Sequence, residues 1–533
     1  MYSENTIPLV VGVTGHRALR PKDRAVLSAA VKAELQDLIR RYPHTQVKLM
    51  TSLAEGADLL CAEEAAALGI PLIVALPMEL SVFEQDFSSD GRNALRRLCS
   101  VAEQVFTVPS AEPASSSMPY RNFCFRQAGI YISSHCHVLL ALWDGKEGTS
   151  GCGTAEAVSF ALSGDFSPDT GLPPRSAANA LVIHILTPRD EESAEPAGTV
   201  RLLGDEPAVR KILSDTDSFN ALAESAVISE RHLLPDDEPD EPCMRRMEQV
   251  YLAASQISAD AAKQYRRTLA LLAVVGSALT MAFLLYDEAQ LVWMILICGA
   301  MLFAGWLCHR YAVRSSCQQL YLECRALAES LRVQLFLRYA GSRRNVPDLL
   351  SWSQREETAW VLAALAALHI GPVPNAEHPI RECWVEDQKK YHLRTEKRDA
   401  GKLAVSSRTV RTALLISITM YVLAVLFELI SGGALLPARI PVADAEKWRT
   451  VLKIVLGSIS AITLFVANYF GKQSLDRSFS DHTKMARFYA VMSERLARCG
   501  QTDALLTVLA REELIENGNW VSYQRDNTPD ISV

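Results

Sequence analysis

The 533-residue sequence lacks several features that would place it in a familiar class. Its twelve cysteines include no CxxC pair, so neither a zinc site nor a disulfide framework is indicated. No basic stretch near the amino terminus leads into an apolar segment of signal-peptide length, and we expect no cleaved leader. The net charge of -7 argues against DNA or RNA as a partner. We expect no metal and no tightly bound cofactor.

Long apolar runs are the most informative feature that is present. They cover approximately residues 268–286, 291–308, 412–430 and 451–470. As a helix, each run is long enough to cross a hydrocarbon core of roughly 30 Å. Only Asp287 to Gln290 separate the first two runs, and the loop Ser431 to Thr450 separates the last two. We therefore predict two transmembrane hairpins that insert into a lipid bilayer.

Basic residues flank both hairpins on the same side of the membrane. They are Lys263, Arg266, Arg267, Arg310, Arg314, Arg408, Arg411, Lys472 and Arg477. Because basic residues stay inside, we expect a multi-pass inner-membrane protein whose amino and carboxyl termini are both cytoplasmic. The second outer loop argues less clearly, since it also contains Arg439, Lys447 and Arg449. Glu428, near the outer end of the third span, either reaches the headgroups or lines a pore.

A different pattern fills the first part of the chain, where short apolar runs alternate with helical patterns. The predicted strands are Ile7–Thr14, Val47–Thr51, Pro71–Pro77, Gln104–Val108, His137–Trp143 and Ala180–Thr187. This alternation is typical of a mostly parallel sheet with helices on both faces. The helix opening at Pro21 is expected to bury Leu27, Val31, Leu35 and Leu38.

Glycine-containing turns follow the strands that end near positions 14, 51 and 143. Ligands of such sheets bind at the carboxyl ends of the strands, where helix N-termini offer free N–H groups to an anion. The candidate nucleotide-binding residues are Thr14, Gly15, His16, Arg17, Glu55, Gly56, Asp58, Asp144, Gly151, Gly153 and Thr154. In the alternative interpretation the glycines only make tight turns, His16 caps a helix, and Arg17 lies on the solvated rim.

Four segments carry a resemblance to the SLOG superfamily, the Rossmann-like nucleotide-binding domains related to DprA and the cytokinin-activating LOG enzymes. They are VVGVTGHR, SLAEGAD, LPMELSVFEQDF, and AGIYISSHCHVLLALWDG followed by GCGTAEAV. The resemblance covers approximately residues 8–187. It implies that the glycine-rich turns hold a nucleotide or a nucleotide-derived signal.

One departure from the LOG enzymes bears on activity. Where they carry GGxGTxxE, this chain has Ser150 at the first glycine position and Ala157 at the glutamate position. Glu156 comes one residue too early, and a shift of one residue turns a helical side chain by about 100°. We therefore expect a binding domain and no enzyme. A nucleotide or NAD hydrolase, cleaving an N-glycosidic bond with Glu55, Asp58 or Glu156, is the alternative.

Two acidic, proline-rich segments separate the sheet from the apolar runs, at Pro188–Glu206 and Pro235–Pro242. Such a composition favours a solvated spacer. The acidic run could instead dock onto a basic partner.

The membrane half contains the same order of features twice: a hairpin, a helix with an apolar stripe, and a WVxxQ motif. The stripes are Leu320, Cys324, Leu327, Leu331 and Leu335, and Phe488, Met492 and Leu496. They stop near Gly341 and Gly500, and WVxxQ occurs at Trp384 and Trp520. We interpret this as a degenerate internal duplication. The stripes pack either within the chain or in a homo-oligomer.

Both repeats resemble SLATT domains, the two-helix membrane effectors associated with SLOG sensors. The likeness rests on the hairpins, on Tyr265-Arg266-Arg267 before the first span, and on the cytosolic helix with Arg325, Glu329 and Arg332.

The predicted fold class is an α/β Rossmann-like (SLOG) cytosolic domain plus an all-α membrane region with four transmembrane helices in two hairpins. The expected domains are a nucleotide-binding domain (1–205), an acidic linker (206–247), a first SLATT-like unit (248–390) and a second one (391–533). Function is then expected to be that of a prokaryotic antiviral defence effector. A nucleotide second messenger or an NAD-derived molecule, of unknown identity, triggers membrane permeabilisation by a homo-oligomer. A regulated channel or transporter is a further alternative.

Overall fold

The computed structural model describes residues 2–109, 119–146, 148, 151–164, 181–189, 195–228, 232–235, 241–351, 358–372, 377–431, 442–472 and 475–526. The chain divides into two compact units. The first combines Met1–Ile257, Glu323–Ile380 and Gln501–Gly518, and the second combines Ser258–Leu322, Arg381–Gly500 and Asn519–Val533. Both units therefore draw on segments that are distant in the sequence.

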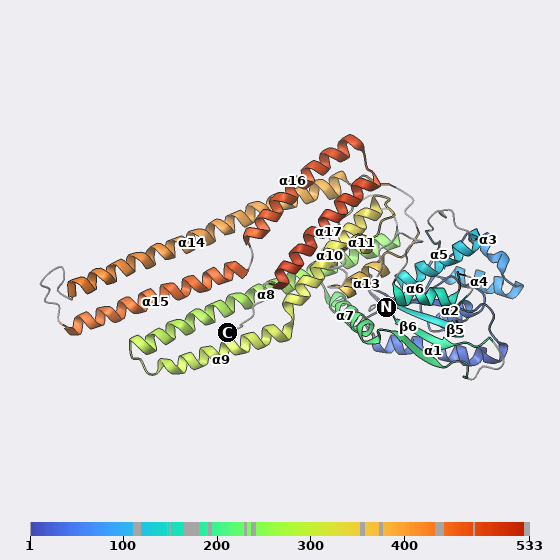
Figure 1. Ribbon diagram of the computed structural model, residues 1–533, viewed down its shortest axis with the longest axis horizontal. Helices are drawn as coiled ribbons and strands as arrows, with labels where there is room; N and C mark the ends of the chain where they lie inside the picture. The colour runs from blue at the N-terminus through green and yellow to red at the C-terminus, as the bar shows by residue number, and fades with distance from the viewer. Residues whose placement is uncertain are drawn as a thin grey trace. The chain divides into compact units, whose positions relative to one another are not determined.

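A seven-stranded sheet in the order β4-β3-β2-β1-β5-β6-β7 forms the centre of the first unit (Figure 1). The strands are β1 (Leu9–Gly15), β2 (Val47–Thr51), β3 (Leu72–Leu76), β4 (Gln104–Thr107), β5 (Val138–Trp143), β6 (Leu181–Leu186) and β7 (Val200–Gly204). All neighbours pair in parallel except β6 and β7, which are antiparallel. The first six match the predicted strands and confirm the α/β class of this part.

Strand β7 was not predicted, because it lies inside the proline-rich segment that we expected to be solvated. Its ladder with β6 pairs Ile185 with Val200 and Leu181 with Gly204. Backbone pairing to a buried neighbour thus outweighs the local composition. As an edge strand, β7 is mostly exposed, which suits its weak apolar signal.

Helices cover both faces of this sheet, because alternate strand residues point to opposite sides. Leu9 and Val11 of β1 join one buried cluster, whereas Val10 joins the other. The first face is covered by α1 (Arg24–Arg41), α2 (Ala57–Ala67), α4 (Ser89–Val101) and α7 (Glu206–Ser225), and the second by α5 (Tyr120–His135), α6 (Thr154–Ser163) and α13 (Ala359–Leu368). In α1 all four predicted apolar positions are buried.

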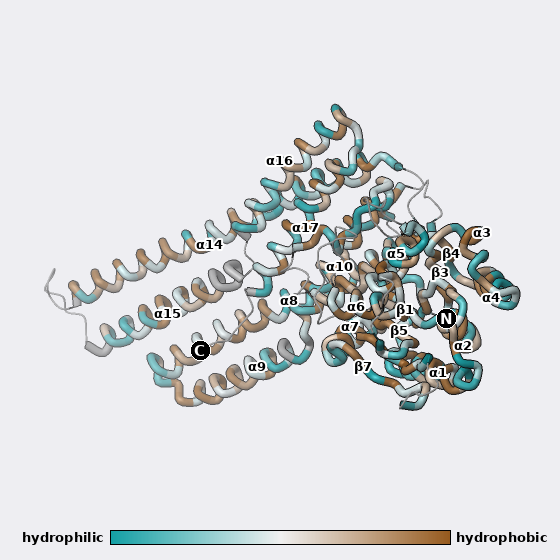
Figure 2. Tube along the Cα trace, turned by 45° about the vertical axis from the view of Figure 1, so that its right-hand side comes forward, coloured by the Kyte–Doolittle hydropathy of each residue, from teal (hydrophilic) through white to brown (hydrophobic). Residues whose placement is uncertain are grey.

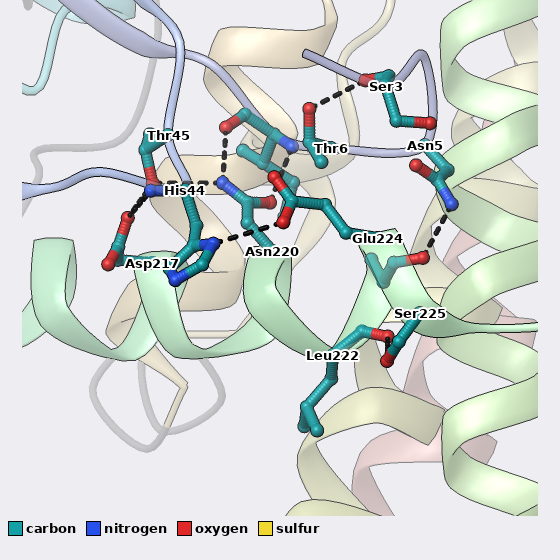
Figure 3. A network of polar contacts seen from close by, with 12 residues as sticks. Ser3, Asn5, Thr6, His44, Thr45, Asp217, Asn220, Leu222, Glu224 and Ser225 are labelled. Carbon is teal, nitrogen blue, oxygen red and sulfur yellow. Dashed lines mark hydrogen bonds and ion pairs between the residues drawn. The ribbon is translucent and has the colours of Figure 1, made fainter. Parts of the chain in front are cut away.

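Helix α7 lies in the segment 206–247 that we expected to be an acidic linker. Figure 3 shows the hydrogen bonds that join it to the residues just before β1 and β2. Asn220 exchanges two hydrogen bonds with the backbone of Ile7, at 2.8 and 2.9 Å, and Asp217 accepts a 2.7 Å bond from Thr45 Oγ1. Residues 206–225 are therefore an ordered part of the first unit. Residues 236–240 of the acidic run lie outside the described chain.

Segments from the membrane half of the sequence also belong to the first unit. They include α13, α10 (Cys317–Tyr339) from Glu323 onward, α11 (Val346–Leu349), and α17 (Asp503–Asp526) up to Gly518. Ala367 and Ile370, at the end of α13 and just beyond it, pack into the core of the sheet. The expected unit 248–390 is thus divided, because the ten-residue apolar helix α13 is too short to span a membrane and covers the sheet instead.

The second unit contains long apolar helices. Within the described part of the chain, four helices are long and apolar enough to cross a membrane: α8 (Pro242–Glu288), α9 (Met294–Ser315), α14 (Asp387–Ser431) and α15 (Val442–Lys472). Figure 2 shows hydrophobic residues along all of them. The predicted spans are the apolar portions of these longer helices. Helix α15 starts inside the expected outer loop, of which residues 432–441 lie outside the described chain.

Glycines bring α8 and α15 close together. A Cβ at Gly276 would lie 2.5 Å from the ring of Phe465, and one at Gly457 would lie 2.9 Å from Leu284. Position 276 of α8 faces position 465 of α15, and position 284 faces position 457, so the two helices pack antiparallel. Small residues allow such close approach between apolar helices.

Glu428 has an ion-pair partner that the sequence did not reveal. Arg449 of α15 forms two hydrogen bonds of 2.6 Å with its carboxylate. The partner was overlooked because Arg449 was assigned to a loop, whereas α15 begins at Val442. A bidentate ion pair leaves this carboxylate poorly suited to line a pore.

Beyond the apolar segments, α14 packs antiparallel against α16 (Leu475–Cys499). Ser478 donates to Asp399 at 2.9 Å, and His392 Nδ1 lies 2.8 Å from His482 Nδ1. Trp384, in the π-helical stretch Arg381–Glu386, is fully buried. The second WVxxQ motif contacts the other cytosolic helix, since Trp520 packs edge-on against Tyr321 of α10 at 5.4 Å.

Both apolar stripes pack within the single chain. Leu327, Leu331 and Leu335 are fully buried, and Met492 and Leu496 are buried. Phe488 is half-buried. Helices α10 and α16 end just before Gly341 and Gly500, which adopt φ values of 77° and 74°.

Candidate functional site

A cavity of about 500 Å³ opens at the carboxyl ends of the parallel strands. Its walls come from the ends of β1 and β2, from α5, from the N-terminus of α6 and from the segment after β6. Strand β1 lies between β2 and β5; the connection after β1 leads to β2 and the one after β5 leads to β6, so the two connections run toward opposite edges of the sheet. Open α/β sheets bind ligands at such a switch point. The volume falls within the range of small-molecule sites.

Gly15 and Gly56 allow the end of β1 to cross the start of α2. A Cβ at Gly15 would lie 2.3 Å from the Cβ of Ala57. Gly56 has a φ of 96°, and a Cβ there would lie 2.2 Å from the carbonyl oxygen of Arg17. Ala57 N–H then donates to His16 O at 3.0 Å. At Gly56 the tight-turn interpretation therefore holds, whereas Gly15 both serves the crossing and lines the cavity.

His16 is buried and joined to the ends of two other strands. The Arg189 guanidinium lies 2.5 Å from Nδ1, and Oδ1 of Asp144 lies 3.3 Å from Nε2. A guanidinium can only donate, so Nδ1 accepts and the proton of a neutral ring lies on Nε2, facing Asp144. The backbone nitrogen of Asp144 lies 3.1 Å from Nε2, a contact that suits only the other tautomer. Burial, followed by the charge of Arg189, lowers the pKa of His16.

Two arginines supply positive charge to the cavity. Arg17 lies over the ring of Phe125, with its Cζ 4.6 Å from the ring centroid, and Arg189 enters from the segment after β6. Helix α6 begins beside them, and its N-cap Gly153 offers no side chain to occupy the first N–H groups. Thr154 adds a hydroxyl group at the cavity wall. Free N–H groups and arginines together suit a phosphate.

Asp58 is a buried carboxylate of the cavity wall. It accepts a 3.0 Å bond from Thr51 Oγ1 and a longer one, 3.4 Å, from the backbone N–H of Ala54. Burial raises its pKa to about 6, although these hydrogen bonds and the nearby Arg17 oppose the shift. The group therefore changes its charge close to neutral pH.

The other two carboxylates considered for catalysis are engaged elsewhere. Glu55 accepts hydrogen bonds from the hydroxyl and backbone N–H of Ser88, the N-cap of α4, at 2.5 and 3.2 Å. Glu156 lies 3.0 Å from Arg126 of α5. Ala157, one position further along α6, lines the cavity instead. Ser150 lies outside the described residues.

The structure brings together most of the candidate residues and separates a few. Those that line the cavity are Thr14, Gly15, His16, Arg17, Asp58, Gly153 and Thr154. Asp144 does not line the cavity but contacts His16, which does. Gly56 forms the turn that lies against the backbone of His16 and Arg17. Glu55 and Gly151 do not appear among the lining residues, and Gly151 is exposed with a φ of 67°.

Sequence reasoning missed Arg189, Phe125 and Asn122, all of which line the cavity. Arg189 could have been found, because it follows the predicted strand 180–187 at the same edge of the sheet. Phe125 and Asn122 gave no such signal, since they lie on α5, a crossover helix without a motif.

The arrangement can bind an organic phosphate. Phe125, Ala128, Ile132 and Val13 give the cavity an apolar side, while the arginines and the α6 N-terminus give it an anion-binding side. Among the described residues, no group of three or more His, Cys, Asp and Glu side chains could hold a metal ion.

None of the models of known protein families matches this chain, and no curated protein matches it.

Proposed function

We propose that the chain is a membrane effector whose α/β domain binds a nucleotide-derived signal and whose apolar helices then permeabilise the membrane. One observation carries this proposal: a cavity with two arginines and a free helix N-terminus occurs in the same chain as four helices able to cross a bilayer. A sensor and a membrane-active element in one polypeptide suit a signal-gated effector. The resemblance to SLOG and SLATT domains supports the same function, in prokaryotic antiviral defence.

The cavity favours a nucleotide over a simple anion. Its apolar side, at Ala128 and Ile132, is the kind of surface against which a base packs, whereas Arg17 and Arg189 supply charge for phosphates. Cyclic dinucleotides, cyclic oligonucleotides and ADP-ribose derivatives all combine these two chemistries.

Signal-dependent leakage tests the proposal. The full-length protein is reconstituted into vesicles of phosphatidylcholine and phosphatidylglycerol that contain a self-quenched dye. Cyclic mononucleotides, cyclic dinucleotides, cyclic oligonucleotides and cyclic and linear ADP-ribose derivatives are then added one class at a time. We expect one class to release the dye. Leakage that is equally fast without any nucleotide would instead indicate a constitutive channel or transporter.

A matched pair of variants links the leakage to the cavity. Arg17→Gln removes one cation and should raise the half-maximal nucleotide concentration about tenfold to a hundredfold, as expected for a charge-assisted bond. Arg201→Gln removes an exposed arginine of β7, which pairs with Glu195 away from the cavity. Equal responses of the two variants would place the nucleotide elsewhere.

A hydrolase is the second candidate, because Asp58 lines the cavity with a pKa raised to about 6 by burial. Such a group can donate and accept protons near neutral pH. Mass spectrometry of the same nucleotides incubated with the protein separates the two functions. Release of a free base by the parent, and none by Asp58→Asn, would favour the enzyme over the sensor.

A further inference from the structure

The two ends of the long apolar helices differ in whether their cations form ion pairs. At the end where α8 finishes and α15 begins, the described cations have acidic partners within the chain. Lys453 Nζ lies 3.0 Å from Glu288 Oε2, and Arg449 binds Glu428. Lys447, the remaining described cation there, lies 3.7 Å from Asp444. Lys447 and Arg449, two of the cations that obscured the orientation of this loop, are therefore each paired with a carboxylate.

At the opposite end, six exposed cations form what we call the basic band: Lys263, Arg266, Arg267, Arg314, Arg408 and Arg411. None of them has an ion-pair partner among the described residues. Acidic residues are scarce beside them. Helix α14 has none between Asp399 and Glu428, the chain has none from residue 289 to 322, and α8 contributes only Asp260 nearby.

The band lies at one common level of the helices. Gln264 of α8 lies 2.5 Å from the hydroxyl of Tyr311 of α9, which places the cations around positions 263–267 and 310–314 beside each other. Arg411 directly precedes the apolar span of α14, and Arg408 lies one turn earlier, about 5 Å along the axis. Headgroup layers are roughly 5–8 Å thick on each side of the hydrocarbon, so both Arg408 and Arg411 fit within one such layer.

We infer that the basic band binds the headgroups of anionic phospholipids in the leaflet at that end. This inference rests on the membrane insertion in the proposed function, but it requires neither a nucleotide nor leakage. The cations are exposed on three helices and share one sign, which matches an extended charged surface. A soluble anion would need them to converge on one cavity. Each such cation near an anionic surface strengthens binding about fivefold.

Lipid titration of the full-length protein in neutral detergent tests the inference. Fluorescent phosphatidylglycerol is added to the parent and to Arg408→Gln/Arg411→Gln, and phosphatidylcholine with the same label serves as the neutral lipid. We expect the parent to prefer phosphatidylglycerol, and the double variant to lose affinity for it about 25-fold. Added salt should weaken the parent's preference, since it screens exposed charges.

The matched control is Arg394→Gln/Lys397→Gln on the same helix. Both residues are exposed and without a described ion-pair partner, but along the helix they lie about 22 to 27 Å before the start of the span. This variant removes the same charge and should bind phosphatidylglycerol as the parent does. An equal loss in both variants would mean that net charge, and not the band, sets the affinity, and the inference would be wrong.

Inorganic phosphate distinguishes the source of the anion. If millimolar phosphate displaces the lipid as completely as unlabelled phosphatidylglycerol does, the band holds soluble anions and the inference fails. Unchanged melting temperatures of both variants in neutral detergent confirm that they are folded. A chain that prefers anionic lipid yet never leaks would contradict the proposed function alone.

Discussion

The Arg189 guanidinium lies 2.5 Å from Nδ1 of His16, although 173 residues separate the two in the sequence. This contact ties the segment after β6 to the end of β1 and places a second arginine beside Arg17 in the cavity. The region around Arg189 looked like a spacer by composition. Its position after a central strand matters more, because all parallel strands end at the same edge of the sheet.

The first prediction concerns this contact. Arg189→Ala should raise the pKa of His16, because the positive charge of Arg189 lowers it, second only to burial, and Asp144 remains to stabilise the charged ring. The His16 ring proton resonance, followed by NMR between pH 4 and 8 in the full-length protein in detergent, measures the shift. Arg201→Ala is the control, since it removes a distant exposed arginine. A His16 pKa that stays at the parent value would mean that the contact does not persist in solution.

The second prediction compares two glycines of the sheet unit that both have positive φ. Gly56→Ala would place its Cβ 2.2 Å from a backbone oxygen, whereas Gly69→Ala, at φ 72°, meets no atom within 4 Å. We expect Gly69→Ala to lower the free energy of unfolding by about 1 kcal/mol, the strain of the left-handed backbone alone. Gly56→Ala should cost at least about 3 kcal/mol, because the backbone must also move. Chemical denaturation measures both changes. If the two variants lose the same free energy of unfolding, the backbone where β1 crosses α2 can move at little cost.

Much of the fold was readable from the sequence, for identifiable reasons. Most of the parallel strands are apolar runs because they are buried on both faces, although the edge strand β4 is buried only at Phe106, and the apolar spans stand out by length. The helix α7 and the strand β7 were hidden, because their acidic and proline-containing surroundings resemble a spacer. Long-range contacts hold α7 in place: Asn220 bonds to Ile7, and Val209 and Leu213 pack into the core of the sheet.

The candidate site was recovered in part. The motif residues of the first and last turns line the cavity, since glycine signals mark where backbone passes close to a ligand. Glu55 was expected to face the ligand, because its spacing in the sequence cannot show that it contacts Ser88, the N-cap of α4. The role of α13 was missed for a related reason: ten apolar residues look alike whether they cover a sheet or flank a membrane.

The third prediction concerns the packing of the two hairpins. Gly276→Leu would force a side chain against Phe465 of α15 and should separate α8 from α15. Gly299→Leu on α9 is the control, because a Cβ there meets no atom within 4 Å. In detergent, only the first variant should lower the melting temperature, by several degrees. Crosslinking between cysteines placed at Met281 and Ser458, whose side chains lie 2.9 Å apart, reports the separation directly. Efficient crosslinking in Gly276→Leu would show that the hairpins stay together.

The last prediction uses a charge imbalance between α10 and α17 in the first unit. Three carboxylates, of Glu329, Glu513 and Glu516, lie near two arginines, Arg325 and Arg332. Arg332 lies 2.5 Å from Glu513 and 2.6 Å from Glu329, and Arg325 lies 3.8 Å from Glu329. Glu323, the next carboxylate of α10, accepts a bond from Trp360 Nε1 instead.

Burial raises the pKa of Glu516 to about 7, with Arg325 opposing the shift and the neighbouring carboxylates adding to it. A raised carboxyl pKa means that the folded state holds a proton which the unfolded state has released. Its contribution to stability is therefore complete below pH 4.5, the ordinary value, and is lost as the pH rises through about 7.

Glu516→Gln carries no proton to lose, so its stability should change less between pH 5 and 8 than that of the parent. At pH 8 we expect the variant to be more stable by up to about 3 kcal/mol, which corresponds to the whole shift. Glu512→Gln, an exposed change on the same helix, should follow the parent's pH profile. Thermal unfolding in detergent at several pH values supplies the comparison. If Glu516→Gln and the parent lose stability in parallel from pH 5 to 8, Glu516 is already ionised in the folded protein and α17 does not depend on its proton.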